Sequence, residues 1–154
     1  MKILIIEDDH NKAKKICDFL REAAADSAVT ERRAYQSGLK EAIAANPDLI
    51  VLDMTMPTYE ISLSEKGGRI RPYAGREILS AIKRKKLTSK VVIVTQFESF
   101  GEGADVMTLE QLKTKLQQEF PENYLTTIFY QPSESSWRGR LEQVLTSMKT
   151  LTKN

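Results

Sequence analysis

Acidic and hydroxyl side chains stand at the ends of three apolar segments of the chain. Glu7 and Asp8 follow the first segment, Asp53 ends the second, and Thr95 ends the third. Carboxylates that lie close together raise one another's pKa values, so a cluster of three is costly unless a cation neutralises it. Oxygen ligands completed by water suit Mg²⁺, and a carboxylate that faces this ion can act as a nucleophile and form an aspartyl phosphate. Thr95 could then donate a hydrogen bond to a phosphoryl oxygen.

The segments that carry these residues are predicted to be strands, and helices alternate with them. Short apolar runs bounded by acids or turn residues are typical of strands buried on both faces of a parallel sheet. We predict strands at 2–7, 28–34, 48–53, 90–95 and 125–130, and helices after an N-cap at Asn11 and over 36–45, 75–85, 109–119 and 133–149. This alternation predicts an α/β domain whose ligands bind beyond the carboxyl ends of the strands. The acidic residues and Thr95 would meet at that edge.

The segment 58–74 has no helical period, and its alternation predicts a hairpin that turns at Gly67-Gly68. It emerges beside Asp53, so one hypothesis is that it partly covers the acidic site. The alternative is a solvated surface elaboration, since surface loops tolerate insertions. On the first hypothesis, nearby guanidinium groups would face the acids, those of Arg69, Arg71 and Arg76.

Length and composition are those of an ordinary globular domain. The 154 residues are 41% hydrophobic and 29% charged, and a single cysteine, Cys17, excludes an intramolecular disulfide framework and a cysteine-based zinc site. A net charge of +2 does not favour nucleic-acid binding, and no apolar stretch has the roughly 18 residues of a membrane span. We expect one cytoplasmic domain over 1–150, with insertions at about 58–74 and 96–107, a short tail at 151–154, and neither nucleic acid nor membrane as a partner.

The sequence resembles the receiver domains of bacterial two-component response regulators. The resemblance lies in ILIIEDD at 3–9, PDLIVLDMTMP at 47–57, Gly75, VVIVT at 91–95 and Pro132. It implies a flavodoxin-like (CheY-like), doubly wound sheet of five parallel strands in the order 2-1-3-4-5.

The resemblance also implies a role for each site residue. Asp53 would accept a phosphoryl group from a phosphohistidine, with Thr95 as the switch hydroxyl. Mg²⁺ would be held by Asp8 directly, by Glu7 directly or through water, by Asp53, and by the backbone carbonyl of Thr55. The implied partners are a sensor histidine kinase or phosphotransfer protein and a downstream protein target. A homodimer is left open, and the domain is not expected to be an enzyme.

The sequence departs from the family pattern at several positions. Gln131 stands where the family has a lysine before the proline that follows the last strand, and its amide donates a hydrogen bond but carries no charge. Gln96 replaces the small residue that usually follows the switch hydroxyl, and Ile128 replaces the aromatic residue of the last strand. We expect phosphorylation to bias the conformation less than usual, and Gln131→Lys to strengthen the response.

Three functions are compatible with these residues. The first is a stand-alone receiver domain that signals by docking or phosphorelay, since no output domain follows the last helix of this sequence. The second, favoured by Gln131, is a pseudo-receiver that acts as a phosphorylation-independent docking or dimerisation module. The third, a Mg²⁺-dependent phosphohydrolase, is weak, because it needs a general acid/base and Thr55 stands where an aspartate would be wanted.

Overall fold

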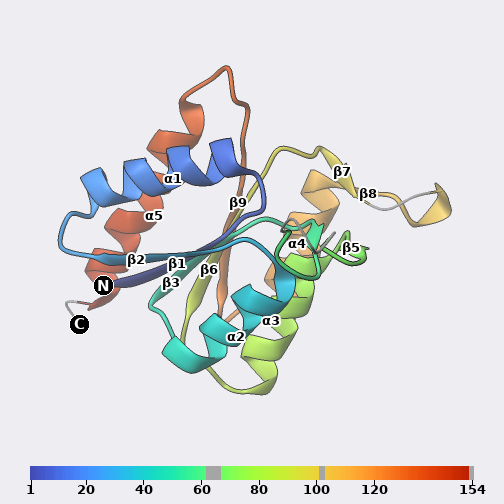
Figure 1. The fold of residues 1–154 in the computed structure, drawn as a ribbon, viewed down its shortest axis with the longest axis horizontal. Helices are drawn as coiled ribbons and strands as arrows, with labels where there is room; N and C mark the ends of the chain where they lie inside the picture. Colours follow the sequence, from blue (N-terminus) through green and yellow to red (C-terminus); the bar gives the residue numbers. More distant parts are fainter. Residues whose placement is uncertain (62–66, 101–102, 153–154) are drawn as a thin grey trace.

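Strands and helices alternate along the chain as predicted (Figure 1). The computed structural model describes residues 1–61, 67–100 and 103–152. The elements of the main domain are β1 (Lys2–Ile6), α1 (His10–Ala23), β2 (Ala28–Arg32), α2 (Tyr35–Ala45), β3 (Leu49–Leu52), α3 (Ala74–Arg84), β6 (Lys90–Thr95), α4 (Leu109–Glu119), β9 (Tyr124–Phe129) and α5 (Ser136–Thr152). The predicted boundaries lie within two residues of these, except that α5 begins and ends three residues later than expected.

The described strands of the main domain form one parallel sheet in the order β2-β1-β3-β6-β9. This is the expected order 2-1-3-4-5, counted over those strands alone. Ile3 to Ile6 of β1 lie opposite Leu49 to Leu52 of β3, which in turn lie opposite Lys90 to Ile93 of β6. Because the strands are parallel and in this register, the residues that follow β1 and β3 emerge at the same edge as the end of β6.

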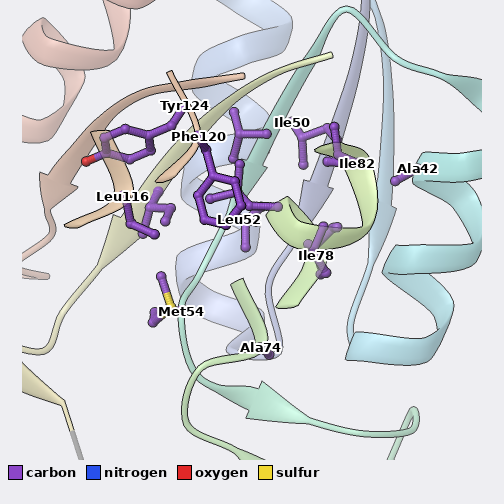
Figure 2. Packing of buried hydrophobic residues seen from close by; sticks show 14 of the residues in the cluster. Ala42, Ile50, Leu52, Met54, Ala74, Ile78, Ile82, Leu116, Phe120 and Tyr124 are labelled. Carbon is purple, nitrogen blue, oxygen red and sulfur yellow. The ribbon is translucent and has the colours of Figure 1, made fainter. Parts of the chain in front are cut away.

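Helices cover both faces of the sheet. Helices α1 and α5 lie on one face, and α2, α3 and α4 on the other (Figure 1). Side chains of β3 alternate between them: Ile50 and Leu52 pack toward α3 and α4, as Figure 2 shows, while Leu49 and Val51 pack toward α1 and α5. Cys17 and Trp137 are buried on the face that α1 and α5 cover. None of the described helices is long and apolar enough to span a membrane.

Helix α1 begins two residues earlier than a cap at Asn11 would place it. The side chain of Asp9, not that of Asn11, caps it, accepting a hydrogen bond from the backbone N–H of Lys12 at 3.0 Å. The sequence offers both Asp9 and Asn11 as capping residues; Asp9 is confirmed and Asn11 is not, because the Asp9 carboxylate already accepts from an N–H group of the first turn. With this cap, Lys12 is the third residue of α1.

The first insertion forms a small antiparallel ladder between β4 (Met56–Pro57) and β5 (Ile70–Arg71). The backbone N–H of Tyr59 donates to the carbonyl of Gly67 at 2.9 Å, so Gly67 and Gly68 belong to the returning arm. The antiparallel pairing of the hairpin was predicted correctly, but Gly67 and Gly68 do not form its turn. Both glycines have positive φ angles, of 84° and 67°, which favour glycine there.

The guanidinium groups near this hairpin bind elsewhere than the acidic site. Arg71 pairs with Glu77 at 3.3 Å and its guanidinium lies 4.3 Å from the centre of the Tyr35 ring. Arg76 forms an ion pair with Glu119 at 2.9 Å. Arg71 and Arg76 therefore pair with carboxylates of α3 and α4 and, for Arg71, with the Tyr35 ring of α2, and not with the acids of the site.

The second insertion was predicted as a loop and contains another short antiparallel pair. Strand β7 (Ser99–Phe100) pairs with β8 (Met107–Thr108), with a 3-10 turn at Gly103–Asp105 between them. Phe97 is exposed and Phe100 is buried. Thr108 then caps α4 through a capping box with Gln111, which fixes where that helix begins.

Candidate functional site

Three carboxylates from two strands converge at the carboxyl edge of the sheet. Glu7 and Asp8 follow β1, and Asp53 follows β3. Each offers a carboxylate oxygen that lies within 4.8 Å of the other two. Glu7 and Asp53 are each 3% exposed, and Asp8 is half-buried. The convergence expected from the sequence is therefore present, and it leaves Asp8 as the carboxylate nearest to solvent.

The backbone orients the two buried carboxylates. The N–H of Asp53 donates to the carbonyl of Ile6 at 3.2 Å, and the N–H of Glu7 donates to Arg32 at 3.0 Å, so both residues continue the sheet ladder. One oxygen of Asp53 accepts from the backbone N–H of Met54 at 2.7 Å. One oxygen of Glu7 accepts from the N–H of Asp9 at 3.1 Å. Each carboxylate therefore has a second oxygen that is free for another partner.

That partner is the ammonium group of Lys12 in α1. Its Nζ lies 2.7 Å from Glu7 Oε2, 2.9 Å from Asp53 Oδ2, and 2.6 Å from the backbone carbonyl oxygen of Val94. The side chain is 1% exposed. An ammonium has three N–H groups and no acceptor, so these contacts use its whole donor capacity. Lys12 thus joins α1 to the ends of β1, β3 and β6.

Burial and charge shift the pKa values of this cluster. Burial is the largest influence on Glu7 and raises its pKa from 4.5 to about 8, with Lys12 opposing and Asp53 adding to the rise. Burial also raises the pKa of Asp8. Burial lowers the pKa of Lys12, but the attraction of Asp53 and Glu7 outweighs it, so this pKa lies above its ordinary value. Lys12 therefore stays charged, and Glu7 favours a proton or another cation as a partner.

The raised pKa of Glu7 predicts how stability depends on pH in the presence of a chelator. Between the unfolded value of 4.5 and about 8, the folded state binds more protons at Glu7 than the unfolded state does. The stability that Glu7 contributes is therefore complete below the lower value and is lost as pH rises through the upper one. Urea unfolding should show wild type losing on the order of a few kcal/mol against Glu7→Gln across this range. Parallel pH profiles of the two proteins would contradict the shift.

The other predicted site residues have hydrogen-bond partners outside the carboxylate cluster. Thr95 is fully buried at the end of β6, directly after the carbonyl that binds Lys12, and its hydroxyl accepts from the N–H of Phe97 at 3.2 Å. The hydroxyl of Thr55 donates to the carbonyl of Pro72 at 2.9 Å, which anchors the first insertion. Gln131 is exposed, and its amide nitrogen faces the Glu134 carboxylate at 2.7 Å. Gln131 therefore lies beside Glu134, just before α5. The cation that contacts Asp53 is Lys12 instead.

Sequence reasoning missed Lys12, although one signal pointed to it. Lysines in amphipathic helices are usually solvated, because a lysine is rarely buried unless an anionic group pairs with it. From the sequence, Lys12 is therefore expected to be exposed. Lys12 stands four residues before Ile16, so it shares the apolar face of α1. A cation on the buried face of a helix that starts beside Glu7 and Asp8 needs an anionic partner. Only the packing of α1 across the strand ends shows that Asp53 is one.

Sequence comparisons connect this site to known proteins. No protein-family model matches the chain. It is 31% identical to the uncharacterized protein y4jR of Sinorhizobium fredii over 150 residues, which cover 96% of this chain and 99% of that protein. It is 25% identical to the Detocs response regulatory protein DtcB of Enterobacter cloacae, over 96% of this chain and 100% of that protein. It is also 31% identical to the transcriptional regulatory protein CiaR of Streptococcus pneumoniae, covering 82% of this chain and 57% of that regulator.

Solved structures agree on the fold. A CheY-like response regulator receiver domain from Methanospirillum hungatei superposes with a TM-score of 0.66 at 17% identity, covering 99% of this chain and 96% of that one. The response regulator TrrA of Thermotoga maritima, solved in complex with Mg²⁺ and BeF, superposes with a TM-score of 0.64 at 16% identity over 96% of this chain and 97% of that one. The chain has the fold of a response-regulator receiver domain.

The donor set of this receiver domain fits a hard divalent cation. Glu7, Asp8 and Asp53 offer only oxygen atoms, and Mg²⁺ prefers oxygen ligands with water completing its shell. With Lys12 counted, the fully ionised cluster carries a net charge of −2 (three carboxylates against one ammonium), which a divalent ion balances. The receiver domain therefore retains an acidic site that can take Mg²⁺ while keeping a lysine bound to two of its members.

Proposed function

We propose that this receiver domain accepts a phosphoryl group on Asp53, in a reaction that depends on Mg²⁺, and passes the signal on by docking to another protein or by phosphorelay. The observation that carries the proposal is the buried Asp53 carboxylate held within 4.8 Å of Glu7 and Asp8 at the carboxyl edge of the sheet. The donor would be a phosphohistidine of a sensor kinase or of a phosphotransfer protein in the cytoplasm, and neither nucleic acid nor membrane is expected as a partner.

The chemical step needs little from the protein beyond orientation and charge. An oxygen of Asp53 bonds to phosphorus while the bond from phosphorus to the donor nitrogen breaks, and that nitrogen keeps the bonding electron pair. An ionised carboxylate attacks without giving up a proton, so no general base is required. Glu7, Asp8 and the Thr55 carbonyl would hold Mg²⁺ beside Asp53, where its charge offsets that of the phosphoryl oxygens. Thr95, at the end of β6, would donate to one of those oxygens.

Intact-mass measurement tests the proposal directly. Wild-type protein incubated with Mg²⁺ and acetyl phosphate should gain the mass of one phosphoryl group, with the acyl oxygen as leaving atom. Asp53→Ala should gain none, and neither should wild type in excess chelator. A matched control is Asp26→Ala, an exposed aspartate outside the cluster. Absence of any mass gain in wild type, or an equal gain in Asp53→Ala, would refute the assignment of Asp53.

Metal binding should appear as a gain in thermal stability. An ion that binds only the folded state stabilises that state by mass action, so millimolar Mg²⁺ should raise the melting temperature of wild type. Asp8→Asn removes one charge and should reduce this response strongly, whereas Asp26→Asn should leave it unchanged. Equal responses in wild type and Asp8→Asn would argue against the site.

A second function, the pseudo-receiver, is favoured by one specific observation. The ammonium of Lys12 already neutralises part of the buried charge, so the acidic cluster can persist without any metal. On this alternative the domain docks or dimerises in the same way whether or not Asp53 is modified. Wild-type protein that gains no phosphoryl mass, yet folds stably in chelator, would favour it over the first function.

A further inference from the structure

The contacts of Lys12 leave one of its N–H groups in the place where a phosphoryl group on Asp53 would arrive. The ammonium has one contact to Glu7 and one to the Val94 carbonyl, neither of which changes chemically on phosphorylation. Its third contact is to Asp53 Oδ2 at 2.9 Å. The other oxygen of Asp53 is occupied by the backbone N–H of Met54. A phosphoryl group bonded to Asp53 would therefore bring its own oxygens next to the Lys12 ammonium.

We propose that Lys12 is the phosphoryl-binding cation of this domain, supplied by α1. Its ammonium stays on Glu7 and the Val94 carbonyl, while the N–H that faces Asp53 in the free protein turns to a phosphoryl oxygen carried by Asp53. A charge-assisted hydrogen bond of this kind is about twice as strong as a neutral one, and more so in a site closed to water. The proposal rests on the phosphoacceptor function proposed above.

Two of the arginines considered for this site from the sequence are paired with other carboxylates. Arg71 and Arg76 pair with Glu77 and Glu119. Gln131, whose neutral amide was expected to weaken the phosphorylated state, lies beside Glu134 instead. Since Lys12 already supplies an ammonium to Asp53, we expect Gln131→Lys alone to add little to the response, in contrast to the expectation from the sequence.

Side-chain NMR of the lysines tests the proposal on the wild-type protein. The ammonium of Lys12 is buried and fully hydrogen-bonded, so its protons exchange slowly enough to give a signal. Fluoroberyllate, a mimic of the phosphoryl group, is added to protein saturated with Mg²⁺. The Lys12 ¹⁵N signal should shift, while that of the exposed Lys14 in the same helix should not. A Lys12 signal that stays in place while the backbone amides of Asp53 and Met54 shift would overturn the proposal.

A substitution of Lys12 distinguishes the contribution of its ammonium from that of Mg²⁺. In Lys12→Met, measured in Mg²⁺ so that a cation remains beside the acids, fluoroberyllate should bind at least about tenfold more weakly than to wild type. Mg²⁺ affinity should not fall, because a repelling charge beside the metal site is removed. The control is Lys14→Met, which should bind both ligands as wild type does. Equal fluoroberyllate affinity in wild type and Lys12→Met would also overturn the proposal.

The single tryptophan reports these titrations. The Tyr130 ring lies 5.7 Å from the Lys12 ammonium and 5.4 Å from the Trp137 ring, so a change at Lys12 is expected to alter Trp137 fluorescence. Wild type that binds no fluoroberyllate in Mg²⁺ would overturn the phosphoacceptor function and this inference together. Wild type that binds it with no involvement of Lys12 would overturn this inference alone.

Discussion

Lys12→Met is expected to lower the free energy of unfolding by about 3–5 kcal/mol in the presence of a chelator, because it leaves two buried carboxylates without their shared counter-ion. Glu7 and Asp53 are both almost fully buried, so water cannot replace the ammonium. Chemical denaturation of wild type and variant at one pH above about 8, where Glu7 is ionised in the folded wild type, measures the difference. The comparison also shows how much of the fold depends on the site.

Two further variants establish that the loss comes from buried charge. Lys14→Met breaks the ion pair between Lys14 and Asp18, whose side chains are 75% and 57% exposed, and should leave the stability almost unchanged because water screens that pair. Adding Glu7→Gln to Lys12→Met removes one of the unpaired charges and should recover part of the loss. If Lys12→Met were as stable as Lys14→Met in chelator, the buried ion pair would not support the fold.

Gly75→Ala and Gly139→Ala should change stability in opposite directions, although both glycines lie in helices. A Cβ on Gly75 in α3 would lie 2.9 Å from the carbonyl oxygen of Asp53 and 2.8 Å from a methyl group of Leu52. The backbone contact cannot relax freely, so we expect a loss of about 1–3 kcal/mol. A Cβ on Gly139 in α5 meets nothing within 4 Å, and alanine there should gain up to about 1 kcal/mol from helix propensity.

The substitution at Gly75 should also reach the site. The N–H of Gly75 donates to the carbonyl of Met54 at 3.0 Å, so α3 rests directly on the segment that follows Asp53. Pushing the two apart should weaken the Mg²⁺-dependent rise in melting temperature in Gly75→Ala but not in Gly139→Ala. Equal stability and equal Mg²⁺ response in the two variants would contradict the close contact.

The ion pairs of Lys12 connect the chemistry at Asp53 to two helices. Lys12 belongs to α1, and the Tyr130 ring that it faces packs on Trp137 at the start of α5. Both helices cover the same face of the sheet. A change in the partner of the Lys12 ammonium is therefore expected to alter the packing of α1 and α5 on this face. The opposite face, with α3 and α4, is reached through the Asp53–Met54 segment and Gly75.

The order of elements was predictable because it depends on local patterns. Apolar runs such as Leu49 to Leu52 need burial on both faces, and they can obtain it only in a parallel sheet covered by helices. Parallel strands place their carboxyl ends together, so the meeting of Glu7, Asp8 and Asp53 followed from the sequence and the sheet order alone. The resemblance of these segments to receiver domains agrees with the fold of the solved structures and with the sequence similarity to a response regulatory protein.

What the sequence could not determine is which groups neutralise that cluster. Competition between partners decides it: Asp9 caps α1 in place of Asn11, the nearby carboxylates bind Arg71 and Arg76, and Gln131 faces Glu134. Each outcome depends on distances between elements far apart in the chain. The burial of Lys12 between β1, β3 and β6 is the clearest case, because a lysine is solvated by default and is buried only where three acceptors from three strands converge on it. Only the tertiary structure brings those acceptors together.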